Sequence, residues 1–289
     1  MSALVRRARR LASRVRRPDA ELEQELARTR DRLRATRGKL RTAQQETAAL
    51  KRQLRAVRSS VRSPFPDLLL PERVDEVVRR ARREHLTYLS AENLGVLAGC
   101  VVEADRSGRP GLVLEAGTAL GGSAIVMASA KAADRPMKVY DVFGMIPPPT
   151  DKDGGDVHER YDKIVRGESA GLSGDVYYGY HDDVYAEVRA SFERLGVPVE
   201  EHDVELVKGL FQDTIDLDEP VAFAHLDGDW YESTMTCLER IAPLLSPGGR
   251  IVLDDYFAWS GCATAVDEYF AGRAGYRIER RARLHVVRL

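Results

Sequence analysis

Two short apolar runs, 221–226 and 249–253, each lead directly into a pair of acidic residues. Runs of this length, separated by a helical stretch, are typical of parallel strands in an α/β sheet. Ligands of such sheets bind at the carboxyl ends of the strands, so we expect the four carboxylates to converge. They repel one another unless a cation lies between them, which makes a divalent metal site the first hypothesis. The four acidic residues are Asp227, Asp229, Asp254 and Asp255.

The same alternation of apolar runs and helical stretches extends over most of residues 111–289. It predicts an α/β fold built on a doubly wound, mostly parallel seven-stranded sheet. The last two strands follow each other across a turn, so one of them should run antiparallel. We expect strands at 111–116, 137–143, 203–207, 221–226, 249–255, 276–280 and 283–288. We expect helices at 122–133, 183–195, 232–244 and 262–273, after one or two more within 71–99.

Residues 144–182 interrupt this pattern. They contain three consecutive prolines at 147–149 and a stretch rich in Asp and Gly at 151–156. Both features predict irregular structure. A long loop beside strand ends is usually a functional lid or a mobile surface, so we expect this segment to cover the site.

Residues 1–63 differ from the rest of the chain in charge. They hold 19 of the 44 basic residues and 6 of the 45 acidic ones, a net charge of +13 against −14 for the remainder. A heptad pattern over 22–61 predicts a coiled coil that joins identical chains, although threonine occupies three core positions. A lone arginine-rich helix is the alternative. Prolines at 64 and 66 then break the helix. We divide the chain into an arm (1–63), a linker with a helical lead-in (64–110) and an α/β domain (111–289).

The first 17 residues are basic and amphipathic, with seven arginines. Such a segment suits an anionic membrane surface, and the alternative is a solvated basic tail. Nucleic acid is not the expected partner because no base-reading motif accompanies the arginines. No apolar run approaches the ~20 residues that span a bilayer, and no secretory signal is present. The cysteines are scattered, as in a reducing compartment: Cys100, Cys237 and Cys262. We therefore expect a cytoplasmic protein, peripheral at the inner face of the membrane.

A glycine-rich turn follows the first predicted strand and opens a helix. Gly117 and Gly121 there let the backbone approach a ligand closely. The turn lacks the GxGxxG pattern of dinucleotide-binding folds. Asp141 ends the second strand, where a carboxylate can accept both ribose hydroxyls of a nucleoside. The combination suits S-adenosylmethionine, which carries no phosphate. The alternative is a tight strand-to-helix turn with a helix-capping aspartate.

Several short motifs lie at or near the ends of the predicted strands. They are Glu115-x-Gly117-x-x-x-Gly121-Gly-Ser123, Asp141-x-Phe143, Val207-Lys-Gly-Leu-Phe-Gln-Asp-Thr214, Leu226-Asp-Gly-Asp-Trp-Tyr-Glu-Ser-Thr234, Ser246-Pro-Gly-Gly249 and Asp254-Asp-Tyr256. In this combination the chain resembles the macrocin O-methyltransferase (TylF-like) family over roughly residues 85–289. The resemblance implies a class I fold, S-adenosylmethionine and magnesium as cofactors, and methyl transfer to a sugar-bearing acceptor.

The resemblance also implies roles for individual residues. It assigns Asp227, Asp254 and Asp255 to the metal and Asp229 to the general base. The alternatives are a helix N-cap for Asp229 and a solvated pair for Asp254 and Asp255. Trp230 stands where the family usually has leucine, so the resemblance does not name the acceptor. The cofactor-binding residues that it implies are Thr87, Glu115, Gly117, Gly121, Ser123, Asp141 and Asp213.

Two other functions stay open at this point. A catechol-type or other small-molecule O-methyltransferase would use similar metal chemistry. An inactive scaffold acting through its coiled coil is the second alternative, against which the intact acidic quartet argues. His225 lies inside a predicted strand and is more often a packed core histidine than a ligand. Trp230 and Tyr231 flank the proposed base, where they either stack on a sugar ring or pack beneath the lid.

Overall fold

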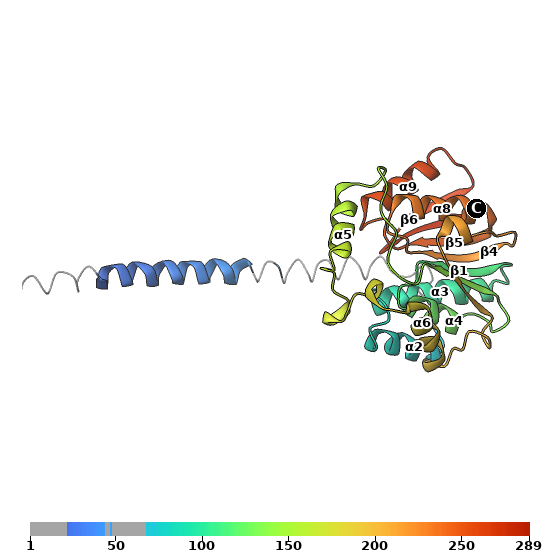
Figure 1. Ribbon diagram of the computed structural model, residues 1–289, viewed down its shortest axis with the longest axis horizontal. Helices are drawn as coiled ribbons and strands as arrows, with labels where there is room; N and C mark the ends of the chain where they lie inside the picture. Colours follow the sequence, from blue (N-terminus) through green and yellow to red (C-terminus); the bar gives the residue numbers. More distant parts are fainter. Residues whose placement is uncertain (1–21, 44–46, 48–67) are drawn as a thin grey trace, which may run out of the picture. The chain divides into compact units, whose positions relative to one another are not determined.

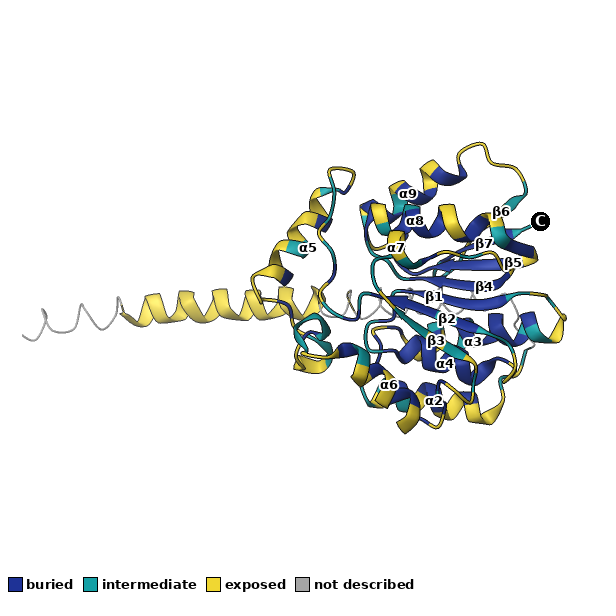
Figure 2. Ribbon diagram, turned by 45° about the vertical axis from the view of Figure 1, so that its right-hand side comes forward, coloured by how far each residue is buried: buried dark blue, intermediate teal, exposed yellow. Residues whose placement is uncertain are grey.

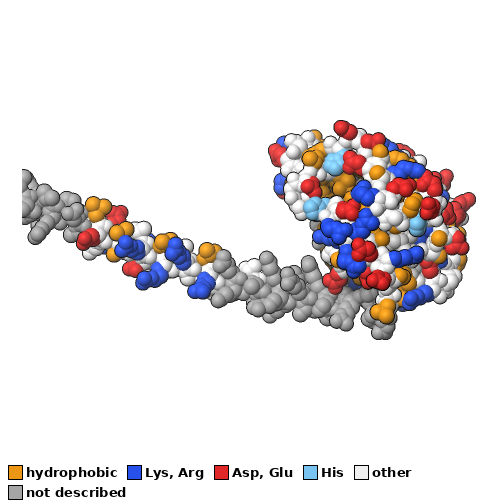
Figure 3. Space-filling view, turned by 90° about the horizontal axis from the view of Figure 1, so that it is seen from below, with side chains coloured by type: hydrophobic (Ala, Val, Ile, Leu, Met, Phe, Trp, Pro, Cys, Tyr) orange, Lys and Arg blue, Asp and Glu red, His pale blue; other side chains and the backbone are white. Residues whose placement is uncertain are grey.

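The chain divides into two units, Met1–Ser60 and Val61–Leu289. A computed structural model describes residues 22–43, 47 and 68–289 of them (Figure 1). In the first unit, residues 22–43 form a helix whose hydrophobic side chains are interleaved with basic ones (Figure 3). The leucines of the predicted seam are at least 50% exposed on it: Leu22, Leu26, Leu33 and Leu40. Pairing of this seam stays a prediction, and most of 44–61 and all of 1–17 lie outside the described residues.

The second unit contains a seven-stranded sheet with the strand order β3-β2-β1-β4-β5-β7-β6, which confirms the predicted fold. β7 runs antiparallel to both β5 and β6, and the other neighbouring strands are parallel. β5 ends at Leu253, so the two aspartates predicted within it follow the strand instead. The strands are β1 (Leu112–Ala116), β2 (Met137–Asp141), β3 (Val204–Lys208), β4 (Val221–Leu226), β5 (Leu245–Leu253), β6 (Tyr276–Arg280) and β7 (Leu284–Arg288).

Helices cover both faces of this sheet, and the central strands β1 and β4 are buried throughout, whereas the edge strands β3 and β6 are partly exposed (Figure 2). One apolar core joins the sheet to α2 (Glu72–Arg83), α3 (Ala91–Arg106), α4 (Gly122–Ala130) and α6 (Val184–Arg194). The helices of the predicted lead-in are thus part of the domain core. The opposite core contains α8 (Tyr231–Ile241) and α9 (Ser260–Phe270), with the short α7 (Phe211–Thr214) packed against it. Among the described residues, no helix is both long enough and apolar enough to cross a bilayer.

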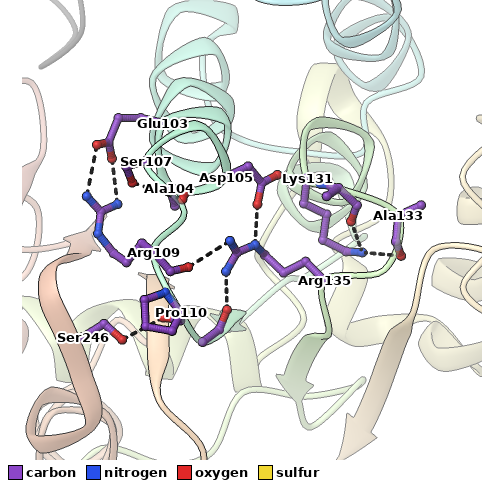
Figure 4. Close-up of polar contacts among 12 residues, drawn as sticks. Glu103, Ala104, Asp105, Ser107, Arg109, Pro110, Lys131, Ala133, Arg135 and Ser246 are labelled. Carbon is purple, nitrogen blue, oxygen red and sulfur yellow. Dashed lines mark hydrogen bonds and ion pairs between the residues drawn. The ribbon is translucent and has the colours of Figure 1, made fainter.

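Charged side chains at the amino ends of the strands are paired (Figure 4). Arg109 donates two parallel hydrogen bonds to Glu103, at 2.7 and 3.0 Å. Arg135 is paired with Asp105 and also donates to the carbonyl of Arg109 at 3.0 Å. Ser246, at the start of β5, donates to the carbonyl of Pro110 at 2.7 Å. These contacts connect α3, the loop before β2 and the beginning of β5.

The prediction of irregular structure throughout 144–182 was wrong, because α5 (Gly155–Val165) lies within this segment. The Asp- and Gly-rich stretch is where the helix begins, with Gly154 as N-cap and Asp156 in the first turn. Val157 and Ile164 then recur at helical spacing and are buried. Together with Ile146 and Trp230 they form a small separate apolar cluster. The segment is therefore a packed wall with its own core.

Candidate active site

A cavity of about 540 Å³ opens at the carboxyl ends of the parallel strands. Its floor is formed by the turns that follow β1, β2, β4 and β5, and residues of 144–182 form the opposite wall. This is the position that ligands occupy in open α/β sheets. Six of the residues predicted from the sequence line it: Gly117, Asp141, Asp227, Asp229, Asp254 and Asp255.

Three of these carboxylates form a tight cluster. Asp227, Asp254 and Asp255 each offer an oxygen atom, and these oxygens lie within 4.8 Å of one another. The backbone hydrogen bonds between neighbouring strands continue past the strand ends and hold the cluster in place. The N–H of Asp227, for example, donates to the carbonyl of Ala116 at 2.8 Å. Burial and the neighbouring carboxylates raise the pKa of Asp227 strongly and that of Asp255 to about 6.

Asp229 projects into the same cavity from a strained turn. Its φ of 55° lies in the left-handed region, which few residues other than glycine adopt. Its N–H donates to Oδ2 of Asp255 at 3.0 Å, which fixes this conformation. Burial and the charge of Asp255 raise its pKa well above the ordinary value. The alternative role of Asp229 as a helix cap is wrong, because the N-cap residue of α8 is Trp230, whose side chain makes no capping hydrogen bond.

The first-turn N–H of α8 is satisfied from elsewhere in the chain. Oδ1 of Asp153, just before α5, accepts the N–H of Tyr231 at 2.8 Å. Nε1 of Trp230 donates to the carbonyl of Pro147 at 3.0 Å. These two bonds join the 144–182 wall to the turn that carries Asp229. Asp153 was not among the residues predicted from the sequence, because its partner in α8 lies 78 residues further along the chain and no local signal marks the contact.

Glu115 is not at the cavity, contrary to the role that the resemblance implies. It is fully buried in β1, and its Oε1 accepts the Nδ1–H of His225 in β4 at 2.8 Å. Nε2 of His225 lies 3.8 Å from Oδ1 of Asp254. The Nε–H of Arg283 donates a hydrogen bond to the same oxygen at 2.5 Å. Burial opposes a charge on His225, but the two carboxylates outweigh it and raise its pKa to about 9. His225 is therefore neither an apolar core residue nor a cavity residue.

The glycine-rich turn is shaped by contacts with its neighbours. Gly117 has a φ of 87°, and a Cβ atom there would lie 1.9 Å from the carbonyl oxygen of Asp227. Asp141 accepts backbone N–H groups of Thr118 and Ala119 on Oδ2, at 2.7 and 3.1 Å. Burial raises the pKa of Asp141, and these hydrogen bonds oppose the shift. Asp141 thus holds the turn while it faces the cavity.

The remaining predicted cofactor residues do not line the cavity. Thr87 and Ser123 are buried beside the start of α4. Thr87 packs so closely against Gly122 that a Cβ atom on this glycine would lie 2.7 Å from Cβ of Thr87. Gly121 has a φ of 84° as the N-cap of α4 and packs against Val188. Asp213 is exposed on α7, whereas its neighbours Leu210, Phe211 and Gln212 line the cavity.

Aromatic side chains line much of the cavity. Arg160 of α5 also lines the cavity and was not among the residues predicted from the sequence. The guanidinium of Arg160 lies 5.6 Å from the ring centroid of Tyr177. Trp259, which also lines the cavity, packs edge-on against Trp230 at 5.8 Å between ring centroids. The aromatic residues that line the cavity are Tyr88, Tyr177, Tyr178, Phe211, Trp230 and Trp259.

A mostly parallel seven-stranded sheet with antiparallel β7, a glycine-rich turn after β1 and an acid ending β2 define a class I S-adenosylmethionine-dependent methyltransferase. The family model of macrocin-O-methyltransferase (TylF) matches residues 72–277, and the chain belongs to this family. It is therefore an S-adenosylmethionine-dependent O-methyltransferase.

Relatives named as O-methyltransferases match about two thirds of the chain. The 8-demethyl-8-(2,3-dimethoxy-alpha-L-rhamnosyl)-tetracenomycin-C 4'-O-methyltransferase of Streptomyces olivaceus is 34% identical over 199 residues, which are 65% of this chain and 69% of that protein. The mycinamicin III 3''-O-methyltransferase of Micromonospora griseorubida is 32% identical over 189 residues, 63% and 69% of the two chains. The solved structure of the O-methyltransferase NovP is 27% identical, with a TM-score of 0.58 over 70% of this chain and 81% of that one.

Proposed function

We propose that the protein transfers the methyl group of S-adenosylmethionine to a sugar hydroxyl of a glycan or glycosylated natural product, with the help of Mg²⁺ or Mn²⁺. The observation that carries the proposal is one cavity in which Asp229 lies beside the cluster of Asp227, Asp254 and Asp255. The names of relatives support the acceptor class, because one specifies a rhamnosyl group on tetracenomycin C. An inactive scaffold would not need four mutually repelling carboxylates in one cavity.

The donor set fits the proposed cation. Carboxylate oxygens are the ligands that Mg²⁺ and Mn²⁺ prefer, and the three oxygens are within 4.8 Å of one another. Burial and the neighbouring carboxylates raise the pKa of both Asp227 and Asp255, and a bound cation would offset the repulsion among these carboxylates. When bound, the cation would polarise the acceptor hydroxyl and make its proton easier to remove. Asp227, Asp254 and Asp255 would hold it.

Asp229 has the position of a general base. Its carboxylate would accept the proton of the acceptor hydroxyl, while the hydroxyl oxygen forms a bond to the methyl carbon. The carbon–sulfur bond breaks at the same time, and its electron pair stays on sulfur. The products are a methyl ether, S-adenosylhomocysteine and a protonated Asp229. The turn around Gly117 and Asp141 would hold the methyl donor, and aromatic side chains of the cavity would stack on the sugar ring.

Radiolabelled methyl transfer tests this proposal. Full-length protein, labelled S-adenosylmethionine and Mg²⁺ are incubated with rhamnosyl, fucosyl and mannosyl glycosides and with a catechol. We expect labelled methyl ethers of at least one glycoside, none in excess EDTA, and recovery when Mg²⁺ or Mn²⁺ is restored. Transfer to the catechol alone would favour the catechol-type alternative. Full turnover in EDTA would refute the role of the metal.

We also propose that the arm joins identical chains through 22–61 and attaches them to the inner face of the membrane through 1–17. The exposed leucines of the helix over 22–43 support the first part, and the seven arginines of 1–17 support the second. Deleting residues 1–63 should lower the oligomeric state, abolish salt-sensitive binding to anionic liposomes and leave transfer to a soluble acceptor intact. Light scattering and liposome sedimentation measure both effects. A full-length chain that is monomeric and does not bind liposomes would refute both roles of the arm.

A further inference from the structure

A row of three polar residues crosses the sheet beneath the carboxylate cluster. Glu115 in β1 is directly opposite His225 in β4, and His225 is opposite Val252 in β5, two residues before Asp254. Side chains two residues apart on a strand point to the same face, so Glu115, His225 and Asp254 lie on one side of the sheet. Glu115 and His225 are completely buried, and Asp254 is 9% exposed.

Two atoms of this row have no hydrogen-bond partner within the described part of the chain: Oε2 of Glu115 and Nε2 of His225. Leaving polar atoms unpaired in a core costs free energy. An apolar pair of similar size would fill the same space without that cost. The unpaired Nε2 faces Oδ1 of Asp254 at 3.8 Å. This arrangement indicates that the row serves Asp254 and not only the packing of the core.

The contacts of Asp254 divide its two oxygens. Arg283 donates to Oδ1 at 2.5 Å, and Nε2 of His225 approaches the same atom. No described residue donates a hydrogen bond to Oδ2, although Asp254 lines the cavity and belongs to the cluster of three carboxylates. One oxygen is thus held by the protein, and the other is left for a ligand.

We infer that Glu115 and His225 are positioning residues for the metal ligand Asp254. Glu115 fixes the ring of His225 through Nδ1, and His225 together with Arg283 orients the carboxylate so that Oδ2 faces the cation. The inference rests on the proposed metal site. Partners behind a ligating group typically change metal affinity by ~10–100-fold when they are mutated.

Two substitutions of His225 separate positioning from packing. The amide nitrogen of asparagine can replace Nδ1, which faces Glu115, and that of glutamine can replace Nε2, which faces Asp254. We expect His225→Asn to weaken Mn²⁺ binding by ~10–100-fold and His225→Gln to stay closer to the wild type. Glu115→Ala should weaken it in the same direction as His225→Asn, because the ring loses its anchor.

Titration calorimetry of the full-length protein with Mn²⁺ at pH 7.5 measures the affinity. Binding of S-adenosylhomocysteine and the melting temperature report on the fold, and Glu115→Gln replaces any variant that does not fold. His285→Gln is the matched control, since His285 is equally buried in β7 but contacts Arg250 instead of a carboxylate. Equal Mn²⁺ affinity in His225→Asn and the wild type would overturn the inference alone. A wild type that binds no Mn²⁺ would overturn the proposed metal site and the inference together.

Discussion

The two ends of the central sheet treat charge in opposite ways. At the amino end, Arg109 forms a bidentate ion pair with Glu103, and Arg135 forms an ion pair with Asp105. At the carboxyl end, three carboxylates are packed within 4.8 Å, and among the described residues only Arg283 donates a charged hydrogen bond to one of them. The first arrangement stabilises the fold. The second opposes folding through the mutual repulsion of the carboxylates, which is a common sign of a functional site.

Removing one carboxylate of the cluster should have the largest effect. Asp255→Ala is expected to lose metal binding and, with it, several kcal/mol of transition-state stabilisation, ~10³-fold or more in rate. The same change should raise the stability of the metal-free protein, because it relieves repulsion with Asp254. Calorimetry with Mn²⁺ and thermal unfolding in EDTA measure the two effects. A variant that binds Mn²⁺ normally, or that is destabilised in EDTA, would break the comparison.

Asp229→Asn should separate the base from the ligands. Asparagine is nearly isosteric but cannot take a proton, so the rate should fall by roughly 10²–10⁴-fold. Binding of Mn²⁺ and S-adenosylhomocysteine should stay close to the wild type. Asp216→Asn, an exposed position away from the cavity wall, is the control and should leave the rate unchanged. Near-normal turnover by Asp229→Asn would remove the base from the mechanism.

At the amino end, the expected effect is on stability and not on catalysis. Arg135→Gln leaves the Asp105 carboxylate and two backbone carbonyls without their donor, which should lower the free energy of unfolding by about 2–3 kcal/mol. Urea unfolding measures it. The exposed pair of Arg166 and Glu168 provides the control, since solvent screens this pair and Arg166→Gln should leave the free energy of unfolding nearly unchanged. A large loss of turnover in folded Arg135→Gln would show that the two ends are coupled.

His285, between the two ends, gives the smallest predicted effect. Burial and the adjacent Arg250 lower its pKa from 6.5 to about 3. The unfolded chain therefore binds a proton that the folded chain excludes, and stability present above pH 6.5 is lost as the pH falls toward 3. Between pH 7 and pH 5 this group should remove about 2 kcal/mol. Urea unfolding of the wild type and His285→Gln at both pH values tests it, and parallel losses in the two proteins would contradict it.

The convergence of the carboxylates could be predicted from the sequence, because parallel strands place their carboxyl ends at one edge whatever their exact register. Register itself could not. Glu115 was assigned to the cofactor from its place in a motif, whereas its partner depends on which residue of β4 lies beside it. The pairing of Glu115 with His225, 110 residues away in sequence, has no local signal.

The interruption at 144–182 shows a different limit. Prolines and an Asp- and Gly-rich stretch outweighed a short apolar period in the sequence interpretation, although Val157, Tyr161 and Ile164 have helical spacing. A single turn-rich stretch is compatible with both a loop and a helix start, and only the packing of α5 against Trp230 decides between them. Asp153, which caps α8 from this segment, could not be assigned for the same reason.

The contact between Gly117 and the carbonyl of Asp227 has a consequence for divergence within the family. No side chain fits between these two backbones, since a Cβ atom would come within 1.9 Å of that oxygen. A substitution at position 117 would displace both the turn that follows β1 and the turn that carries Asp227. We therefore expect a change of acceptor to arise more easily in the 144–182 wall than in these two turns, which can change only in concert.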